Sequence, residues 1–266
     1  MKQRMTGYGA PCLVSLALLF AGCAQSPSPQ GGEAPAQSGE SYRARVHTEL
    51  AAQYYSRRQY TVALQELREV LTTDANHAPA YNMLALVHIE LHEEKEAEDY
   101  FRRAIDLLPN YSEAHNNFGY FLCQRGRFGE GLEQLELALK NPLYASPEKA
   151  LANASYCALM KGDVTESERY AKRSLARAAN QPVALLSLAE ARFRQGEALQ
   201  ARTQLQQLAS LSPLDAAALW LGVRIERQLG NRVAEGDHGA QLRRRFPDAR
   251  ETRWLLAGQY DQWGGK

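Results

Sequence analysis

The chain has 266 residues, with 31 basic against 30 acidic side chains and a formal net charge of +1. This balance gives no general attraction for nucleic acid, so nucleic-acid binding by a basic surface is excluded. The length is enough for one elongated domain or two compact ones.

Residues 1–22 have the pattern of a lipoprotein signal peptide. Two basic side chains precede an apolar run, 13–21, which matches a signal-peptide core, whereas crossing a bilayer takes about 20 apolar residues. Small residues then lead to Cys23. This stretch resembles the bacterial lipobox, which implies that the thiol of Cys23 accepts the lipid. The alternative is an ordinary secretory signal with an incidental cysteine.

The residues after Cys23 predict where the chain is anchored. An Asp directly after the cysteine resembles the inner-membrane retention signal of enteric-type bacteria, and Ala24 stands there instead. We therefore expect the lipidated chain to be anchored at the periplasmic face of the outer membrane. Residues 24–41 carry no large apolar side chain and cannot bury enough surface to offset ordering entropy. We expect 23–41 to be a lipidated flexible tether, spanning roughly 20 to 25 Å.

Residues 42–263 repeat themselves. Ala63, Ala97 and Gly131 follow at 34-residue intervals, and a large apolar residue keeps the same step four positions after each. A 34-residue period is the mark of tetratricopeptide repeats, whose two antiparallel helices cross at small residues. We expect an all-α right-handed superhelix of six helix pairs, the last degenerate, then a short C-terminal helix and no strands.

The period is interrupted once, at a loop with two prolines. Ser167 lies 36 residues after Gly131, and the extra residues fall in 141–147, where proline stops helix propagation. Turns within the later repeats carry glycines, whose tolerance of left-handed backbone suits a helix stop. These glycines are Gly126, Gly162, Gly196 and Gly230.

We expect that the chain is not an enzyme and that it binds no cofactor, no metal and no small-molecule substrate. His88 and His92 would lie one helical turn apart and could hold a metal. They lack the His-Glu order of zinc peptidases, and His88 occupies an ordinary packing position of the repeat. The basic run 243–245 falls in the last turn of a predicted helix, where cations oppose the helix dipole. Contact with lipid headgroups or an acidic partner is the alternative.

Two cysteines remain once Cys12 has left with the signal and Cys23 carries lipid. Cys123 and Cys157 fall in the first helices of consecutive repeats, which stack side by side. In an oxidising compartment that stacking allows a disulfide. Two buried free thiols are the alternative.

The first helix of each pair lines the concave face of such a superhelix. An aromatic and apolar lining suits an amphipathic helix or an extended apolar peptide better than a terminal carboxylate. Each ring could instead be only core between repeats. The 34-residue step places at or near this face Tyr55, Leu86, Ile89, Asn116, Tyr120, Tyr156, Leu186 and Phe193.

The central sequence resembles a known family. Residues 115–123 read His-Asn-Asn-Phe-Gly-Tyr-Phe-Leu-Cys, 141–144 read Asn-Pro-Leu-Tyr, and 147–150 read Pro-Glu-Lys-Ala. These stretches are similar to the type IV pilus biogenesis and stability lipoproteins, the PilF/PilW type. The similarity covers nearly all of the mature chain, including a Leu-Arg-Arg-Arg-Phe-Pro ending at 242–247.

This resemblance implies a pilotin, a non-enzymatic lipoprotein that binds the pilus secretin subunit and promotes its assembly in the outer membrane. Cys23 would be the acylated anchor, and Cys123 with Cys157 match a cysteine pair found in part of the family. Residues 116–119 match the family's central motif, and Tyr55 with its neighbour Tyr54 is a candidate secretin contact. The alternative is a general envelope scaffold lipoprotein, serving barrel assembly or cell-wall hydrolases.

Overall fold

The computed structural model describes residues 37–263, and this part of the chain is built from helices alone, without a strand. The predicted signal peptide, Cys23 and most of the predicted tether lie outside these residues. In chain order the helices are α1 (Gln37–Ser56), α2 (Tyr60–Thr73), α3 (Ala78–Glu90), α4 (Glu94–Leu107), α5 (Ser112–Gln124), α6 (Phe128–Lys140), α7 (Pro147–Lys161), α8 (Val164–Arg177), α9 (Pro182–Arg194), α10 (Ala198–Leu211), α11 (Ala216–Gln228), α12 (Arg232–Arg245) and α13 (Arg250–Leu256).

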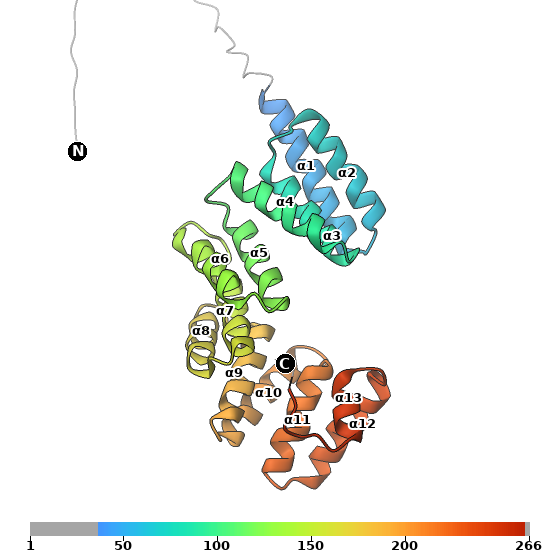
Figure 1. Ribbon diagram of the computed structural model, residues 1–266, viewed down its shortest axis with the longest axis vertical. Coiled ribbons are helices and arrows are strands. Elements are labelled where there is room, and N and C mark those ends of the chain that lie inside the picture. Colours follow the sequence, from blue (N-terminus) through green and yellow to red (C-terminus); the bar gives the residue numbers. More distant parts are fainter. Residues whose placement is uncertain (1–36, 264–266) are drawn as a thin grey trace, which may run out of the picture.

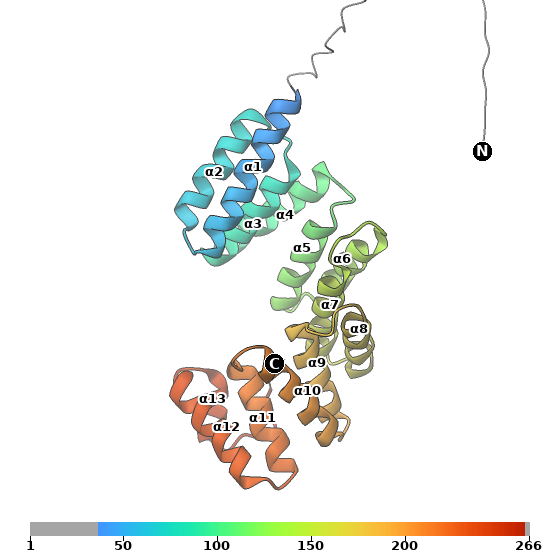
Figure 2. The same cartoon turned by 180° about the vertical axis from the view of Figure 1, so that it is seen from behind.

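The helices α1 to α12 form successive antiparallel pairs, and α13 packs on the last pair. Each odd-numbered helix contacts the next odd-numbered helix, so these helices stack side by side. The stack bends into an open curve, with α5 and α7 on its inner side and α6 and α8 on its outer side (Figure 1, and from behind in Figure 2). The predicted all-α superhelix of six helix pairs is confirmed.

Small buried residues lie where the two helices of a pair cross. Ala63 and Ala97 have no exposed surface, and Leu67 and Phe101, one helical turn further on, are equally buried. Burying such large side chains contributes roughly 1.5 to 3 kcal/mol each. A small residue at the crossing lets the helices approach, and the large residues then fill the space beside it.

The first helix begins at Gln37, earlier than the predicted start of the fold at residue 42. Its first buried side chain is Ala44, and the residues described before it are exposed. These polar residues extend the helix without contributing to the core. Once a helix is nucleated by packing, adding a residue to its end costs little.

A left-handed residue ends the first helix of each pair. The predicted glycines at 126, 162, 196 and 230 all have φ between 73° and 93°. In the first two repeats the same position carries Arg58 and His92, with φ of 59° and 61°. Because α3 ends at Glu90 and His92 lies in this turn, His88 and His92 do not share one helical face.

Replacing His92 by Gly is expected to stabilise the fold. A side chain in left-handed backbone costs about 1 to 2 kcal/mol, and the greater freedom of Gly in the unfolded chain offsets about 0.5 to 1 kcal/mol of that gain. The net increase in unfolding free energy is about 0.5 to 1 kcal/mol, measurable by urea denaturation. His92→Ala is the matched control and should bring no gain. An equal effect of both variants would rule out strain at this turn.

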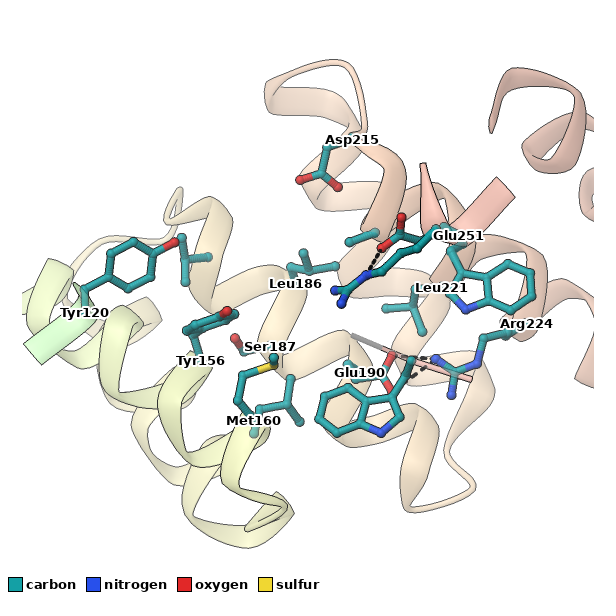
Figure 3. Close-up of a pocket in the computed structure, with 16 residues that line it drawn as sticks. Tyr120, Tyr156, Met160, Leu186, Ser187, Glu190, Asp215, Leu221, Arg224 and Glu251 are labelled. Atoms are coloured by element: carbon teal, nitrogen blue, oxygen red, sulfur yellow. Dashed lines mark hydrogen bonds and ion pairs between the residues drawn. The ribbon is translucent and has the colours of Figure 1, made fainter. Parts of the chain in front are cut away.

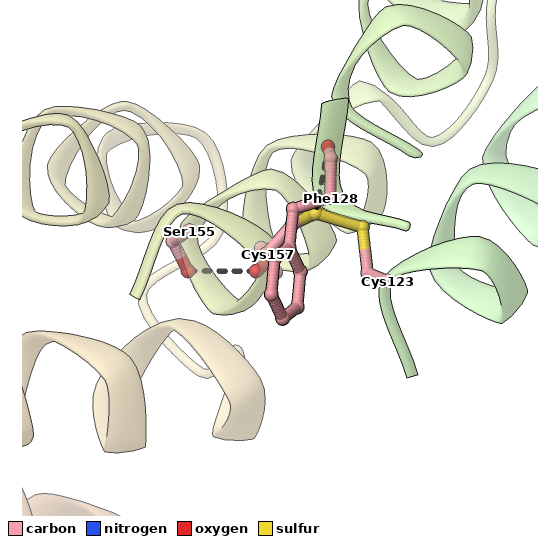
Figure 4. The surroundings of a disulfide bond; sticks show 5 residues. Cys123, Phe128, Ser155 and Cys157 are labelled. Atoms are coloured by element: carbon pink, nitrogen blue, oxygen red, sulfur yellow. Dashed lines mark hydrogen bonds between the residues drawn. A yellow bond between two sulfur atoms is a disulfide. The ribbon is translucent and has the colours of Figure 1, made fainter. Parts of the chain in front are cut away.

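A disulfide joins Cys123 on α5 to Cys157 on α7, with the two Cα atoms 5.3 Å apart (Figure 4). It connects neighbouring odd-numbered helices across the long loop between α6 and α7. The bond also lies beside the α5–α6 crossing, where both helices carry glycine. Gly119 and Gly131 lie so close that a Cβ on either would be 2.8 Å from the carbonyl oxygen of the other.

Within residues 37–263, no helix is both long enough and apolar enough to cross a membrane.

Candidate protein-binding groove

The inner face of the superhelix holds a pocket of about 300 Å³. Its walls come from α5, α7, α9 and α11, which are the first helices of successive pairs, with α13 and the residues after it closing one side (Figure 3). The residues that line it are Tyr120, Tyr156, Leu159, Met160, Val183, Leu186, Ser187, Glu190, Asp215, Ala217, Trp220, Leu221, Arg224, Arg250, Glu251 and Trp263.

One end of the pocket is aromatic. Tyr120 and Tyr156 occupy the same position in consecutive repeats, and their ring centres lie 5.5 Å apart at a tilt of 56°. Burial raises the pKa of both hydroxyls above the usual value, so both rings stay neutral. Met160 and Leu186 continue the apolar surface towards α9. This end can desolvate an apolar side chain of a partner.

The other end is charged. Glu190 on α9 accepts hydrogen bonds from two arginines, at 2.9 Å from Arg194 Nε and 2.9 Å from Arg224 Nη1. Glu190 and Arg224 are 5% and 8% exposed. Figure 3 shows this pair at the opposite end of the pocket from Tyr120. The pocket therefore runs from an apolar to a polar end.

The residues after α13 fold back against the groove. Trp220 on α11 donates from Nε1 to the carbonyl oxygen of Gln262 at 2.8 Å and stacks on Tyr260 at 5.8 Å. The Arg194 guanidinium lies 3.2 Å from the ring centre of Trp263. The predicted C-terminal helix is thus α13 followed by a strap, 257–263, that forms one wall of the pocket.

Three of the predicted groove residues, Tyr120, Tyr156 and Leu186, line this one pocket. Phe193, a turn and a half further along α9 from Ser187, packs partly buried against the core formed by α9 to α13. The guanidinium of Arg224 lies over its ring at 4.6 Å. Phe193 thus supports the charged end of the pocket from behind.

Asn116 is placed by the structure in a chain of side-chain amides. It donates to Asn117 at 3.3 Å and accepts from Asn153 at 2.9 Å, and Asn117 donates to Asn82 at 3.1 Å. Only 7% of Asn116 is exposed. Its amide therefore ties α3, α5 and α7 together, and little of it is accessible from the groove.

The other predicted residues, Tyr55, Leu86 and Ile89, belong to the first two repeats and do not line this pocket. Leu86 and Ile89 are partly buried in the local core. The Tyr55 hydroxyl donates to Glu90 at 3.3 Å, and burial together with this carboxylate raises the pKa of Tyr55 to about 12. Tyr54 packs partly buried in the same cluster as Tyr55.

Sequence analysis missed the charged end, although a signal for it exists. Tyr120 and Tyr156 are 36 residues apart, and further steps of 34 reach Glu190 and then Arg224. The same position in four consecutive repeats therefore carries Tyr, Tyr, Glu and Arg, so that two aromatic residues are followed by two residues of opposite charge. A charged pair at consecutive positions of a stacked face could have been predicted to form an ion pair.

Among the residues that the structure describes, no set of three His, Cys, Asp or Glu side chains is arranged to hold a metal ion. The Nδ1 atom of His88 lies 2.5 Å from Glu93 Oε2, so this imidazole already has a carboxylate partner.

Comparison with known proteins identifies relatives over most of the chain. The tetratricopeptide-repeat family matches residues 78–111. The type IV pilus assembly protein PilF of Pseudomonas aeruginosa is 27% identical over 206 residues, which cover 77% of this chain and 82% of that protein. The solved structure of PilW, described as a widely conserved type IV pilus biogenesis factor, is 31% identical with a TM-score of 0.70, covering 80% of this chain and 98% of PilW.

The chain is a tetratricopeptide-repeat protein of the PilF/PilW type. The solved structure of Pseudomonas aeruginosa PilF agrees, with 26% identity, a TM-score of 0.73 and coverage of 83% of this chain and 99% of PilF. The resemblance expected from the central motif and the proline loop is confirmed. The PilF/PilW-type proteins share the superhelix over nearly the whole range from α1 to α13.

Proposed function

We propose that this protein is a pilotin, a lipoprotein that binds the type IV pilus secretin subunit and promotes its localisation and multimerisation in the outer membrane. The observation that supports this proposal is an aromatic groove on the inner face of a superhelix homologous to PilF and PilW. A desolvated aromatic pocket of this kind binds a protein segment through a few anchor residues.

The charged groups of the groove are engaged in structural contacts, which favours binding over catalysis. Glu190 pairs with Arg224, and Arg250 Nε lies 3.1 Å from Glu251 Oε1. Asp215 accepts from the backbone N–H of Ala218 at the start of α11. A general acid or base must be free to exchange a proton with a substrate, and these carboxylates already accept hydrogen bonds.

The membrane part of the proposal rests on Cys23. Acylation of this residue would hold the superhelix near the membrane through a short tether ending at α1. Each buried methylene of the acyl chains contributes about 0.8 kcal/mol to membrane affinity. The proposed location is the periplasmic face of the outer membrane.

Cells lacking this protein are expected to contain secretin mainly as monomer and to have no surface pili. The measurement is a blot of detergent-resistant secretin multimers, with the wild-type gene restored as control.

A strain complemented with Cys23→Ser should contain soluble periplasmic protein and misplaced secretin multimers. Normal multimer levels in the deletion strain would refute the pilotin function and favour a general envelope scaffold.

Replacing Tyr120 or Tyr156 by Ala is expected to weaken secretin binding by roughly 30-fold. An aromatic anchor in a desolvated pocket contributes about 2 kcal/mol or more to binding. Tyr100→Ala on α4 is a matched control, because Tyr100 is also partly buried but lies outside the pocket. Affinity is measured with the purified secretin domain, alongside the melting temperature of each variant. Unchanged affinity in both folded groove variants would move the contact to another face.

A further inference from the structure

At Glu190 the groove has two guanidiniums beside one carboxylate. Two guanidiniums, Arg194 and Arg224, share the single carboxylate of Glu190. The other charged residues that line the pocket have partners of their own: Arg250 pairs with Glu251, and Asp215 accepts from the backbone N–H of Ala218 at the start of α11. The three side chains on α9 and α11 therefore form a group of their own.

Two donors of these arginines have no acceptor. Nη2 of Arg194 and Nε of Arg224 are buried and make no hydrogen bond. Arg224 is more than nine-tenths buried and lines the pocket. Burial lowers the pKa of Arg194, because the charged form has lost hydration that one shared carboxylate does not replace. Buried polar groups in folded proteins nearly always have partners, so an unpaired cationic donor at a pocket indicates a missing acceptor.

The chemistry of that acceptor follows from the donors. A guanidinium pairs best with a carboxylate, whose two oxygens match its parallel N–H groups. Each guanidinium is also shielded on one face by a ring, since Trp263 covers Arg194 and Phe193 lies under Arg224. In such a low-dielectric site a charge-assisted hydrogen bond is stronger than in water.

The rest of the pocket indicates which side chains of the bound segment accompany the carboxylate. Leu186 lies between the tyrosines and the Glu190–Arg224 pair, and Leu221 lies beside that pair (Figure 3). A ligand that reaches the arginines along this path therefore places apolar side chains on the leucines and tyrosines. An isolated anion would leave that apolar surface uncovered.

We infer that the groove binds a protein segment in which an Asp or Glu side chain follows apolar or aromatic residues, with its carboxylate on Arg224, where the neighbouring charge of Arg194 adds to the attraction. This inference rests on the proposed function only in taking the secretin as the source of the segment. The inference adds a charged subsite to the expected apolar lining. This subsite favours apolar segments that carry an Asp or Glu over those that do not.

The first test compares two end-blocked probe peptides, N-acetylated and C-amidated Phe-Leu-Glu-Leu and Phe-Leu-Gln-Leu. Binding to the mature chain is followed by tryptophan fluorescence, since Trp220 and Trp263 line the pocket. The Glu peptide should bind on the order of tenfold more tightly than the Gln peptide. Equal affinities, or no binding of either peptide, would overturn the inference. So would tight binding of the Gln peptide only when its terminal carboxylate is left free.

The second test asks whether the two arginines cause the preference. Arg194→Gln leaves the Glu190–Arg224 pair in place and removes one of the two guanidiniums, so the preference for Glu should fall to about twofold or less. Arg224→Met should abolish it, but it also removes one of the two partners of the buried Glu190 and so destabilises the chain. Arg194→Gln keeps the test decisive. Arg173→Gln removes an exposed charge on α8 and should keep the full preference. A preference retained in Arg194→Gln would refute the subsite.

Secretin binding separates this inference from the proposed function. If the Glu peptide is preferred but secretin does not bind, the subsite stands and the pilotin function fails. If secretin binds equally well to wild-type protein and to the Arg194→Gln variant, the pilotin function stands and the subsite is not where secretin binds.

Discussion

Gly131→Ala is expected to destabilise the fold by roughly 3 kcal/mol. An added Cβ would collide with Sγ of Cys123 and lie 2.8 Å from the carbonyl oxygen of Gly119. A backbone oxygen and a disulfide sulfur cannot move aside as a flexible side chain can, so the helices α5 and α6 must separate. Overpacking a close contact of this kind costs about 1 to 3 kcal/mol, and here both obstacles are rigid.

The same substitution at Gly129 is the matched control. Gly129 lies on the same helix with nothing within 4 Å of an added Cβ. Because Ala favours helix over Gly, Gly129→Ala should stabilise the chain by up to about 1 kcal/mol. Unfolding in urea, followed by helical circular dichroism, should shift in opposite directions for the two variants. Equal midpoints would show that the α5–α6 crossing has room for a methyl group.

Reducing the Cys123–Cys157 disulfide is expected to lower the unfolding free energy by roughly 3 to 4 kcal/mol. The bond closes a loop of 34 residues, and the chain-entropy model assigns that much stabilisation to such a loop. For a domain of this size the melting temperature should fall by about 10 °C. Tyr120 and Tyr156 belong to the two helices that the bond joins, so reduction should also loosen the aromatic end of the groove.

The matched control for reduction is the Cys123→Ala/Cys157→Ala double variant. Its melting temperature should already be low and should not respond to reductant. Thiol labelling of the unfolded, unreduced mature chain should leave both cysteines unmodified. Reactive thiols at both positions would mean that the cysteines are free in the mature protein.

The helix pairs, their turns and their core follow from local sequence. Each repeat uses the same contacts, so a small residue at 63, 97 and 131 recurs at the same crossing. The same reasoning placed Tyr120 and Tyr156 at or near the concave face, and in the structure their rings are neighbours, because equivalent positions on stacked helices lie close in space. Position in the repeat therefore predicted the backbone and the aromatic end of the pocket.

Repeat position alone could not predict how the asparagine amides pair. Asn116 has the register of a groove residue, yet its amide bonds to two other asparagines. Asn117 is its neighbour on α5, but Asn153 lies on α7, and which amides meet across helices depends on how far each helix is shifted along its neighbour. Contacts of this kind depend on the relative placement of several helices, not on the period.

The sequence by itself determined the superhelix and the side of it that carries the tyrosines, because both follow from contacts that repeat every 34 residues. Tertiary structure decided the pocket. The strap after α13 returns to cover Arg194, and Glu190 meets two arginines of different helices. The position of the strap depends on how α13 and the residues after it pack against earlier helices, and the burial of the Glu190–Arg224 pair depends on how closely α11 approaches α9.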